Sequence, residues 1–231
     1  MKRNEVIRFL ILRSIGNFLV LFAIFGFLAT FGPALYYEVS FRILETRGVH
    51  FTILDQQVKA PTANKPQSIS NFADVLAGPK EQILIPPDPN FSIVIPKIGA
   101  SAKIFANVDP SNPNQFLPIL MQGVAHARGT VFPGMKGNIY LFAHSTDNFW
   151  DVGRYNAIFY LLKDLKVGDE VVIFFENIRY NYIVTNTKIV DPSDVSYIVN
   201  GRYQTDETLI LQTCWPPGTT LQRLLVFAKL K

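Results

Sequence analysis

The feature that most constrains the fold is a series of short apolar runs that starts near residue 91 and continues to the end of the chain. Gly, Pro and Asn separate the runs, and these residues end strands and form turns. In residues 178–184 apolar and polar side chains alternate, as in a strand with one buried face. The pattern predicts an all-β domain with short helices at 115–121 and 155–162. The predicted strands are 91–96, 103–106, 122–126, 137–143, 170–176, 178–189, 207–214 and 221–230.

A second constraint lies near the N-terminus, where residues 15–37 contain no charge and consist largely of Phe, Leu, Ile, Val, Ala and Gly. As a helix, this run is long enough to cross about 30 Å of hydrocarbon. Basic residues precede it and charges balance after it, which predicts a cytoplasmic N-terminus and an extracellular remainder. Because Gly32-Pro33-Ala34 is a poor cleavage site, we expect an uncleaved anchor. A buried core helix is the alternative.

Between the apolar run and the all-β domain, the chain changes character. Residues 38–58 are compatible with a helix, whereas the prolines after residue 59 are interleaved with Thr, Asn, Ser and Gln. That composition predicts an extended spacer, with one short helical turn at 72–76. The predicted parts are a basic cytoplasmic tail (1–14), a transmembrane signal anchor (15–37), a juxtamembrane segment and Pro-rich spacer (38–90) and a catalytic domain (91–231).

Charge and cysteine content exclude several functions. The formal net charge is +4, and three of these charges fall within the first thirteen residues. The remaining chain therefore lacks the basic face of a nucleic-acid-binding protein, and we expect no nucleic acid partner. A single cysteine excludes an internal disulfide and a cysteine-based zinc site. The acidic residues are explained by turns and strand edges, so we expect no metal and no cofactor.

The lone cysteine, Cys214, ends one apolar run, and a Pro-Pro-Gly segment separates it from the next. Proline cannot continue a central strand, so the two runs are predicted to form an antiparallel pair joined by a wide loop. In such a pair, Cys214 and Arg223 become cross-strand neighbours. A permanent cation beside a thiol favours the nucleophilic thiolate. A lone cysteine is also commonly a small buried apolar residue, which would leave the domain without activity.

Covalent catalysis by a thiolate needs a proton donor for the leaving amine, and imidazole suits that role near neutral pH. Two histidines lie in the predicted all-β domain. His144 follows the apolar strand 138–143, and His126 follows Gly123-Val124-Ala125. Periodicity alone does not choose between them, and each is compatible with a hydrogen-bonded structural role.

Several spaced motifs resemble the sortase family. They are the segment 93–98, the run from Gly123 to Thr130, the strand ending at His144, and the segment ending Thr213-Cys214 with Arg223 nine residues on. Sortases are membrane-anchored cysteine transpeptidases built on an eight-stranded β-barrel. The resemblance implies such a barrel with short helices over residues 91–231. It also implies His144, Cys214 and Arg223 as catalytic residues, with His126 and Thr213 supporting them.

The resemblance further implies a function at the cell surface. Cys214 would cleave a C-terminal, LPxTG-like sorting signal of secreted surface proteins through a thioester. The acyl group would then pass to an amine of a cell-wall peptide or a pilin lysine. Two alternatives stay open: a hydrolytic cysteine peptidase with water as acceptor, and a catalytically silent barrel that only binds peptides.

Overall fold

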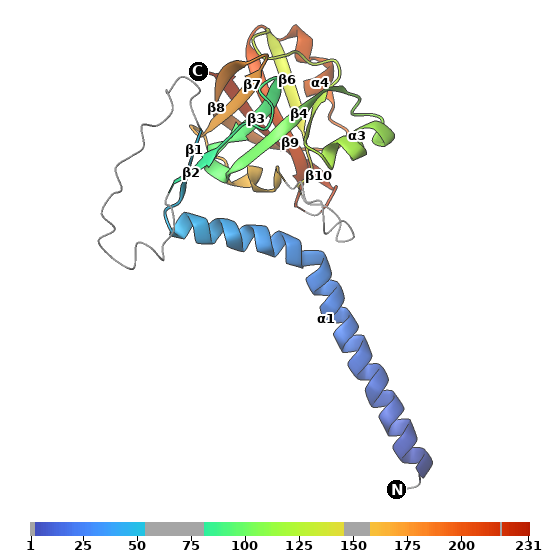
Figure 1. Cartoon of the computed structure of the whole chain (residues 1–231). Coiled ribbons are helices and arrows are strands. Elements are labelled where there is room, and N and C mark those ends of the chain that lie inside the picture. The colour runs from blue at the N-terminus through green and yellow to red at the C-terminus, as the bar shows by residue number, and fades with distance from the viewer. Residues whose placement is uncertain (1–2, 54–80, 146–157, 218) are drawn as a thin grey trace, which may run out of the picture.

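The computed structural model describes residues 3–53, 81–145, 158–217 and 219–231. Its centre is a closed barrel of eight strands in the order β10-β8-β7-β3-β4-β5-β6-β9 (Figure 1). This architecture confirms the predicted all-β fold, an eight-stranded barrel with short helices. The strands are β3 (Phe91–Ile95), β4 (Ala100–Val108), β5 (Val124–Ala127), β6 (Gly137–Phe142), β7 (Glu170–Phe175), β8 (Ile178–Val190), β9 (Glu207–Trp215) and β10 (Gln222–Leu230).

The strand directions decide which residues meet. Within the barrel, β6 is parallel to β9 and β4 is parallel to β5, while the other neighbouring pairs are antiparallel. Because β6 and β9 are adjacent and parallel, they finish at the same end of the barrel. The antiparallel strand β10 begins there. We call this end, where β6 and β9 finish and β10 begins, the Cys214 end.

Period-two alternation sorts the side chains of β9 between two apolar clusters. Leu209 and Leu211 point into the barrel interior, whereas Ile210 belongs to a cluster on the outer face. The outer cluster is covered by α3 (Pro113–Leu120) and α4 (Ser196–Val199), whose residues Phe116 and Tyr197 pack on it. Both faces of these strands are therefore buried, which explains their nearly continuous apolar sequence.

The short helices largely follow the prediction. Helix α3 covers most of predicted segment 115–121, and Asn112 caps it by accepting a hydrogen bond from the Asn114 N–H. Segment 155–162 is replaced by a 3-10 helix, η3 (Tyr160–Asp164), and its first three residues lie outside the described part. Two further 3-10 helices are η1 (Pro96–Ile98) and η4 (Gly201–Tyr203).

The N-terminal region departs from the prediction in three ways. One helix, α1, runs from Arg3 to Thr46 and bends along its length (Figure 1). The part of α1 that is long and apolar enough to cross a membrane is Val6–Ala29, with a mean hydropathy of 2.0. It begins earlier than the predicted span of residues 15–37. Pro33, which has no N–H to donate, falls within the helix.

The other two departures concern strands. Instead of continuing as a helix, the chain forms β1 (His50–Ile53), which pairs in parallel with β2 (Glu81–Leu84) inside the predicted spacer. The pair packs on Val94 and Val172 of the barrel. Alternation over four residues is too short to identify against a Pro-rich background, which is why the sequence did not predict these strands. The helical turn predicted at 72–76 lies outside the described residues.

Candidate active site

Strands β9 and β10 bring Cys214 and Arg223 together as predicted. The two residues are direct partners in the antiparallel register. Since Leu209 and Leu211 point inward, alternation puts Cys214 on the outer face of β9. Leu224 points inward on β10, so Arg223 shares that outer face. Cys214 is a free thiol, and its side chain is partly exposed rather than buried.

His144 reaches the same face from β6. Phe142 pairs with Gln212 in the parallel ladder, so the same register extended by two residues brings His144 level with Cys214. A hydrogen bond from the Ala143 N–H to the Gln212 carbonyl (3.2 Å) continues the pairing beyond β6. His144 is half-buried. The structure therefore brings His144, Cys214 and Arg223 to one rim of the barrel.

Thr213 ties the two strand ends from the inside. Its side chain is buried, and its Oγ1 donates a hydrogen bond of 3.1 Å to the Ala143 carbonyl. The bond joins the residue before His144 to the residue before Cys214. The hydroxyl therefore restrains the separation of the two strands at the point where the histidine and the cysteine follow.

Arg223 is held by the loop that precedes it. Its Nη1 donates to the carbonyl oxygens of Thr220 and Gln222, each at 3.0 Å. Both acceptors are neutral, so neither neutralises the guanidinium charge beside Cys214. The side chain is half-buried, which limits screening of that charge by water.

His126 lies elsewhere. It is fully buried, and its ring stacks on Phe132 with centroids 4.6 Å apart. Nδ1 accepts from the Asn107 N–H (3.3 Å), so Nε2 carries the proton and donates to the Val131 carbonyl (3.0 Å). Burial lowers the pKa of His126, partly opposed by the hydrogen bond to Val131. The ring is a neutral part of the interior and is not brought to the rim with His144.

One pair near the site was missed by sequence reasoning. The Tyr140 hydroxyl donates to Gln212 Oε1 at 2.7 Å, and both side chains lie on the outer face. Tyr140 of β6 is four residues before His144, and Gln212 of β9 is two residues before Cys214. Tyr140 is buried, and burial raises its pKa, so the hydroxyl stays a neutral donor. The signal available in the sequence was the period-two series Tyr140, Phe142, His144 beside Ile210, Gln212, Cys214.

These groups can carry out acyl transfer. A thiol supplies the nucleophile, an imidazole supplies or accepts a proton, and a guanidinium offers donors to a developing oxyanion. The fold and the rim thus define a barrel with the groups of a cysteine acyl-transfer enzyme.

Comparison with known proteins identifies the family. A family model described as a sortase domain matches residues 93–231. Sortase D of Bacillus subtilis (strain 168) is 26% identical over 197 residues, which cover 82% of this chain and 88% of that protein. Sortase A of Listeria monocytogenes is 28% identical over 140 residues, which cover 61% of this chain and 55% of that protein.

Solved structures agree with the sequence matches. Sortase C-1 from Actinomyces oris superimposes with a TM-score of 0.52 and 26% identity, covering 63% of this chain and 76% of that one. A Clostridium perfringens Sortase D5 transpeptidase gives a TM-score of 0.50 and 27% identity, covering 62% and 79%. The chain belongs to the sortase family and is a sortase-type cysteine transpeptidase.

Proposed function

We propose that this protein is a membrane-anchored sortase that cleaves a C-terminal sorting signal of secreted surface proteins and joins the new carboxyl end to an amine. The observation that carries the proposal is the shared register of β6, β9 and β10, which supports a single site made of His144, Cys214 and Arg223. Helix α1 is consistent with a membrane anchor or a signal sequence, and we propose the anchor, with the N-terminus in the cytoplasm and the barrel outside.

The first half of the reaction forms a thioester. The Cys214 thiolate attacks the carbonyl carbon of the scissile peptide bond, and the carbonyl oxygen becomes an oxyanion that the Arg223 guanidinium stabilises. As the C–N bond breaks, the His144 imidazolium gives its proton to the leaving amine. The products are a Cys214 thioester and a released C-terminal fragment.

The second half reverses these steps with another amine. The acceptor amine attacks the thioester carbonyl, neutral His144 takes its proton, and the Cys214 thiolate leaves. The thioester keeps enough reactivity to form an amide without ATP, so the proposal needs no cofactor. Thr213 acts as a positioning residue, because its hydroxyl fixes the main chain beside His144.

The test uses the full chain in detergent micelles with peptides that carry an LPxTG-like motif. We expect mass spectrometry to find an acyl group on Cys214, and we expect an added glycine- or lysine-containing acceptor to divert product from acid to amide. Hydrolysis that no acceptor changes would instead favour a cysteine peptidase. Absence of any acyl-enzyme, with the thiol unreactive toward an alkylating agent, would favour a silent peptide-binding barrel.

A further inference from the structure

The C-terminal part of α1 packs against the barrel. Lys163 Nζ donates to Glu38 Oε2 at 2.7 Å, and Arg42 Nη2 donates to Asp164 Oδ1 at 3.0 Å. Phe41, between these two charged residues of α1, is 7% exposed. The helix is therefore joined to η3 by two ion pairs, and the ring of Phe41 is buried between them in the sequence of α1.

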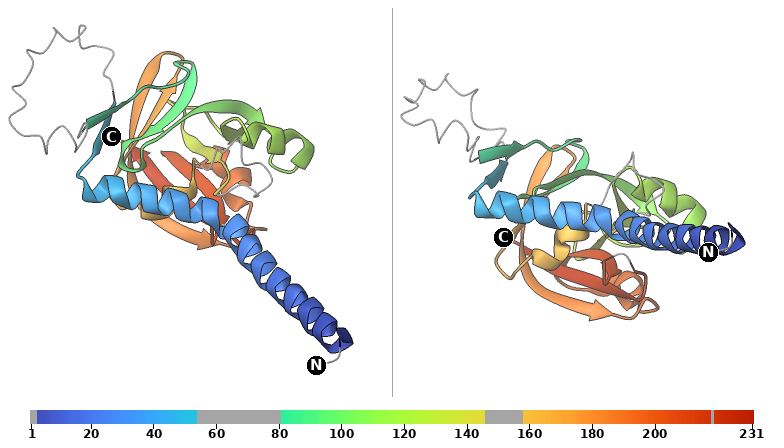
Figure 2. Two further views of the ribbon diagram at one scale, coloured as in Figure 1. Left: turned by 60° about the horizontal axis from the view of Figure 1, so that its bottom comes forward. Right: turned by 90° about the horizontal axis from the view of Figure 1, so that it is seen from below.

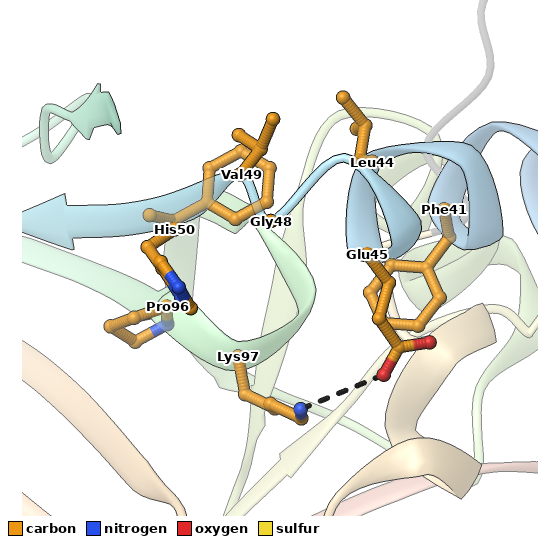
Figure 3. Close-up of a pocket in the computed structure, with 9 residues that line it drawn as sticks. Phe41, Leu44, Glu45, Gly48, Val49, His50, Pro96 and Lys97 are labelled. Atoms are coloured by element: carbon orange, nitrogen blue, oxygen red, sulfur yellow. Dashed lines mark ion pairs between the residues drawn. The ribbon is translucent and has the colours of Figure 1, made fainter. Parts of the chain in front are cut away.

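Further charged side chains extend this contact into a network of ion pairs. Within α1, Arg42 also binds Glu38 and Glu45 at 3.0 Å each, and Glu45 lies 3.9 Å from Lys97 of η1 (Figure 3). The hydrogen bond from Lys163 leads the interactions that lower the pKa of Glu38. Although an isolated exposed pair contributes little, a connected set around a buried ring fixes an orientation better than one pair does.

Strand β1, which follows α1, completes the contact between α1 and the barrel. A small cavity of about 160 Å³ lies between the end of the helix and η1, and its wall includes Val49 and Pro96 (Figure 3). Phe51 of β1 also lines it. The Phe51 ring lies so close to Gly99 that a Cβ there would come within 2.8 Å of it. The helix and the following strand thus wrap one edge of the barrel.

The docked helix lies at the Cys214 end. After β9, the next four strands around the barrel are β10, β8, β7 and β3, and each is antiparallel to the strand before it. Strand β7 therefore begins, and β3 finishes, at the end where β9 finishes. Helix η3 precedes β7 and η1 follows β3, so both contacts of α1 belong to that end. The views agree, because α1 crosses the lower end of the barrel in Figure 1 and lies in front of the barrel when seen from below in Figure 2.

No loop separates the docked part of α1 from its apolar part, since the helix is continuous from Arg3 to Thr46. The residues between Ala29 and Glu38 add only roughly 12 Å of helix at 1.5 Å per residue. We infer that the ion-pair network of α1 turns the Cys214 end of the barrel toward the bilayer. This inference rests on the proposed role of α1 as a membrane anchor.

The orientation has a consequence for the substrate. A substrate held in the same bilayer by its own hydrophobic tail exposes, close to the membrane surface, the peptide segment that precedes the tail. A rim that faces the bilayer meets this segment directly, whereas a rim on the far end would lie higher by the height of the barrel. With nine residues in β9 and a barrel tilt of 35–45°, that height is roughly 20–25 Å.

The chain offers a direct test because Cys214 is its only cysteine. The full chain is reconstituted in lipid nanodiscs with an acceptor dye on the lipid head groups, and a fluorophore is attached to Cys214. The comparison is Tyr203→Cys in a Cys214→Ser background, because Tyr203 is 82% exposed and precedes β9 at the opposite end. We expect energy transfer from position 214 to exceed that from position 203 roughly twofold or more, given the difference in height.

Equal transfer from the two positions, or stronger transfer from position 203, would overturn the inferred orientation. A chain recovered free of lipid would show that α1 is not a membrane anchor, and the orientation would then have no basis. Equal transfer would refute the orientation alone, so the two outcomes are distinguishable. Neither readout depends on turnover, so loss of the proposed acyl transfer leaves the test intact.

A charge variant tests what holds the orientation. Lys163→Glu sets a carboxylate against Glu38, and we expect it to reduce the difference in transfer between the two positions. Lys166→Glu is the matched control, since it makes the same charge change three residues away on an exposed side chain. If Lys163→Glu and Lys166→Glu both leave the difference unchanged, the ion pairs do not orient the barrel.

Discussion

Thr213→Val is the perturbation that most directly tests the join between β6 and β9. Valine keeps the shape of threonine but removes the hydroxyl, so the Ala143 carbonyl loses a 3.1 Å hydrogen bond. Thr213 is 2% and Ala143 4% exposed, which keeps water from replacing the lost donor. A buried acceptor deprived of its partner costs about 1–3 kcal/mol.

The same change acts on the site. Without the bond, the main chain at Ala143 is free to move relative to β9, and His144 follows it. Displacing a catalytic group by about 1 Å lowers a rate by up to roughly a hundredfold. We therefore expect Thr213→Val to reduce the rate of acyl-enzyme formation while leaving the thiol as reactive toward a small alkylating agent as before.

Two measurements check this on the full chain in detergent. Thermal unfolding followed by tryptophan fluorescence should show a midpoint lowered by roughly 2–12 °C, from about 2–4 °C per kcal/mol for a domain of this size. Single-turnover acylation gives the rate. Thr213→Ser keeps the hydroxyl and should recover most of the rate. A serine variant as slow as the valine variant, or a valine variant with wild-type rate and midpoint, would refute the reasoning.

Four further variants test the rest of the site and the buried histidine. Cys214→Ala and His144→Ala should each abolish turnover without lowering the unfolding midpoint by more than a few degrees, since both side chains are partly exposed at the rim; turnover retained by either variant would remove that residue from the mechanism. Arg223→Lys should lower the catalytic rate roughly ten- to a thousandfold, because a flexible ammonium does not reproduce the planar donors of a guanidinium. A wild-type rate in Arg223→Lys would show that Arg223 contributes only its positive charge. The lowered pKa of His126 means that the unfolded chain binds a proton there more readily than the folded one. This contribution to stability is complete above the ordinary histidine pKa of about 6.5 and declines as the pH falls below it, by at most about 1.4 kcal/mol per pH unit for one proton. The unfolding midpoint of His126→Asn should consequently change less between pH 7.5 and 5.5 than that of the wild type, and parallel changes would contradict a neutral buried ring.

The sequence by itself determined the features that depend on local pattern. Alternating apolar residues and turn-forming residues specified the strands of the barrel, because a half-buried strand has a period of two whatever it packs against. The Pro-Pro-Gly loop specified the pairing of Cys214 with Arg223, since a hairpin sets its own register. The sequence also showed that the N-terminal helix is apolar, although it did not predict where that helix begins and ends.

Only the tertiary structure separated the two histidines in space. His126 and His144 both follow short apolar runs, and local pattern treats them alike. The parallel pairing of β6 with β9, distant in sequence, brings His144 level with Cys214, while His126 is enclosed among aromatic rings. The Tyr140–Gln212 bond arises from the same non-local pairing. Likewise, the contacts of α1 with η3 join residues more than a hundred positions apart, and such contacts leave no periodic trace in the sequence because they depend on how the whole barrel closes.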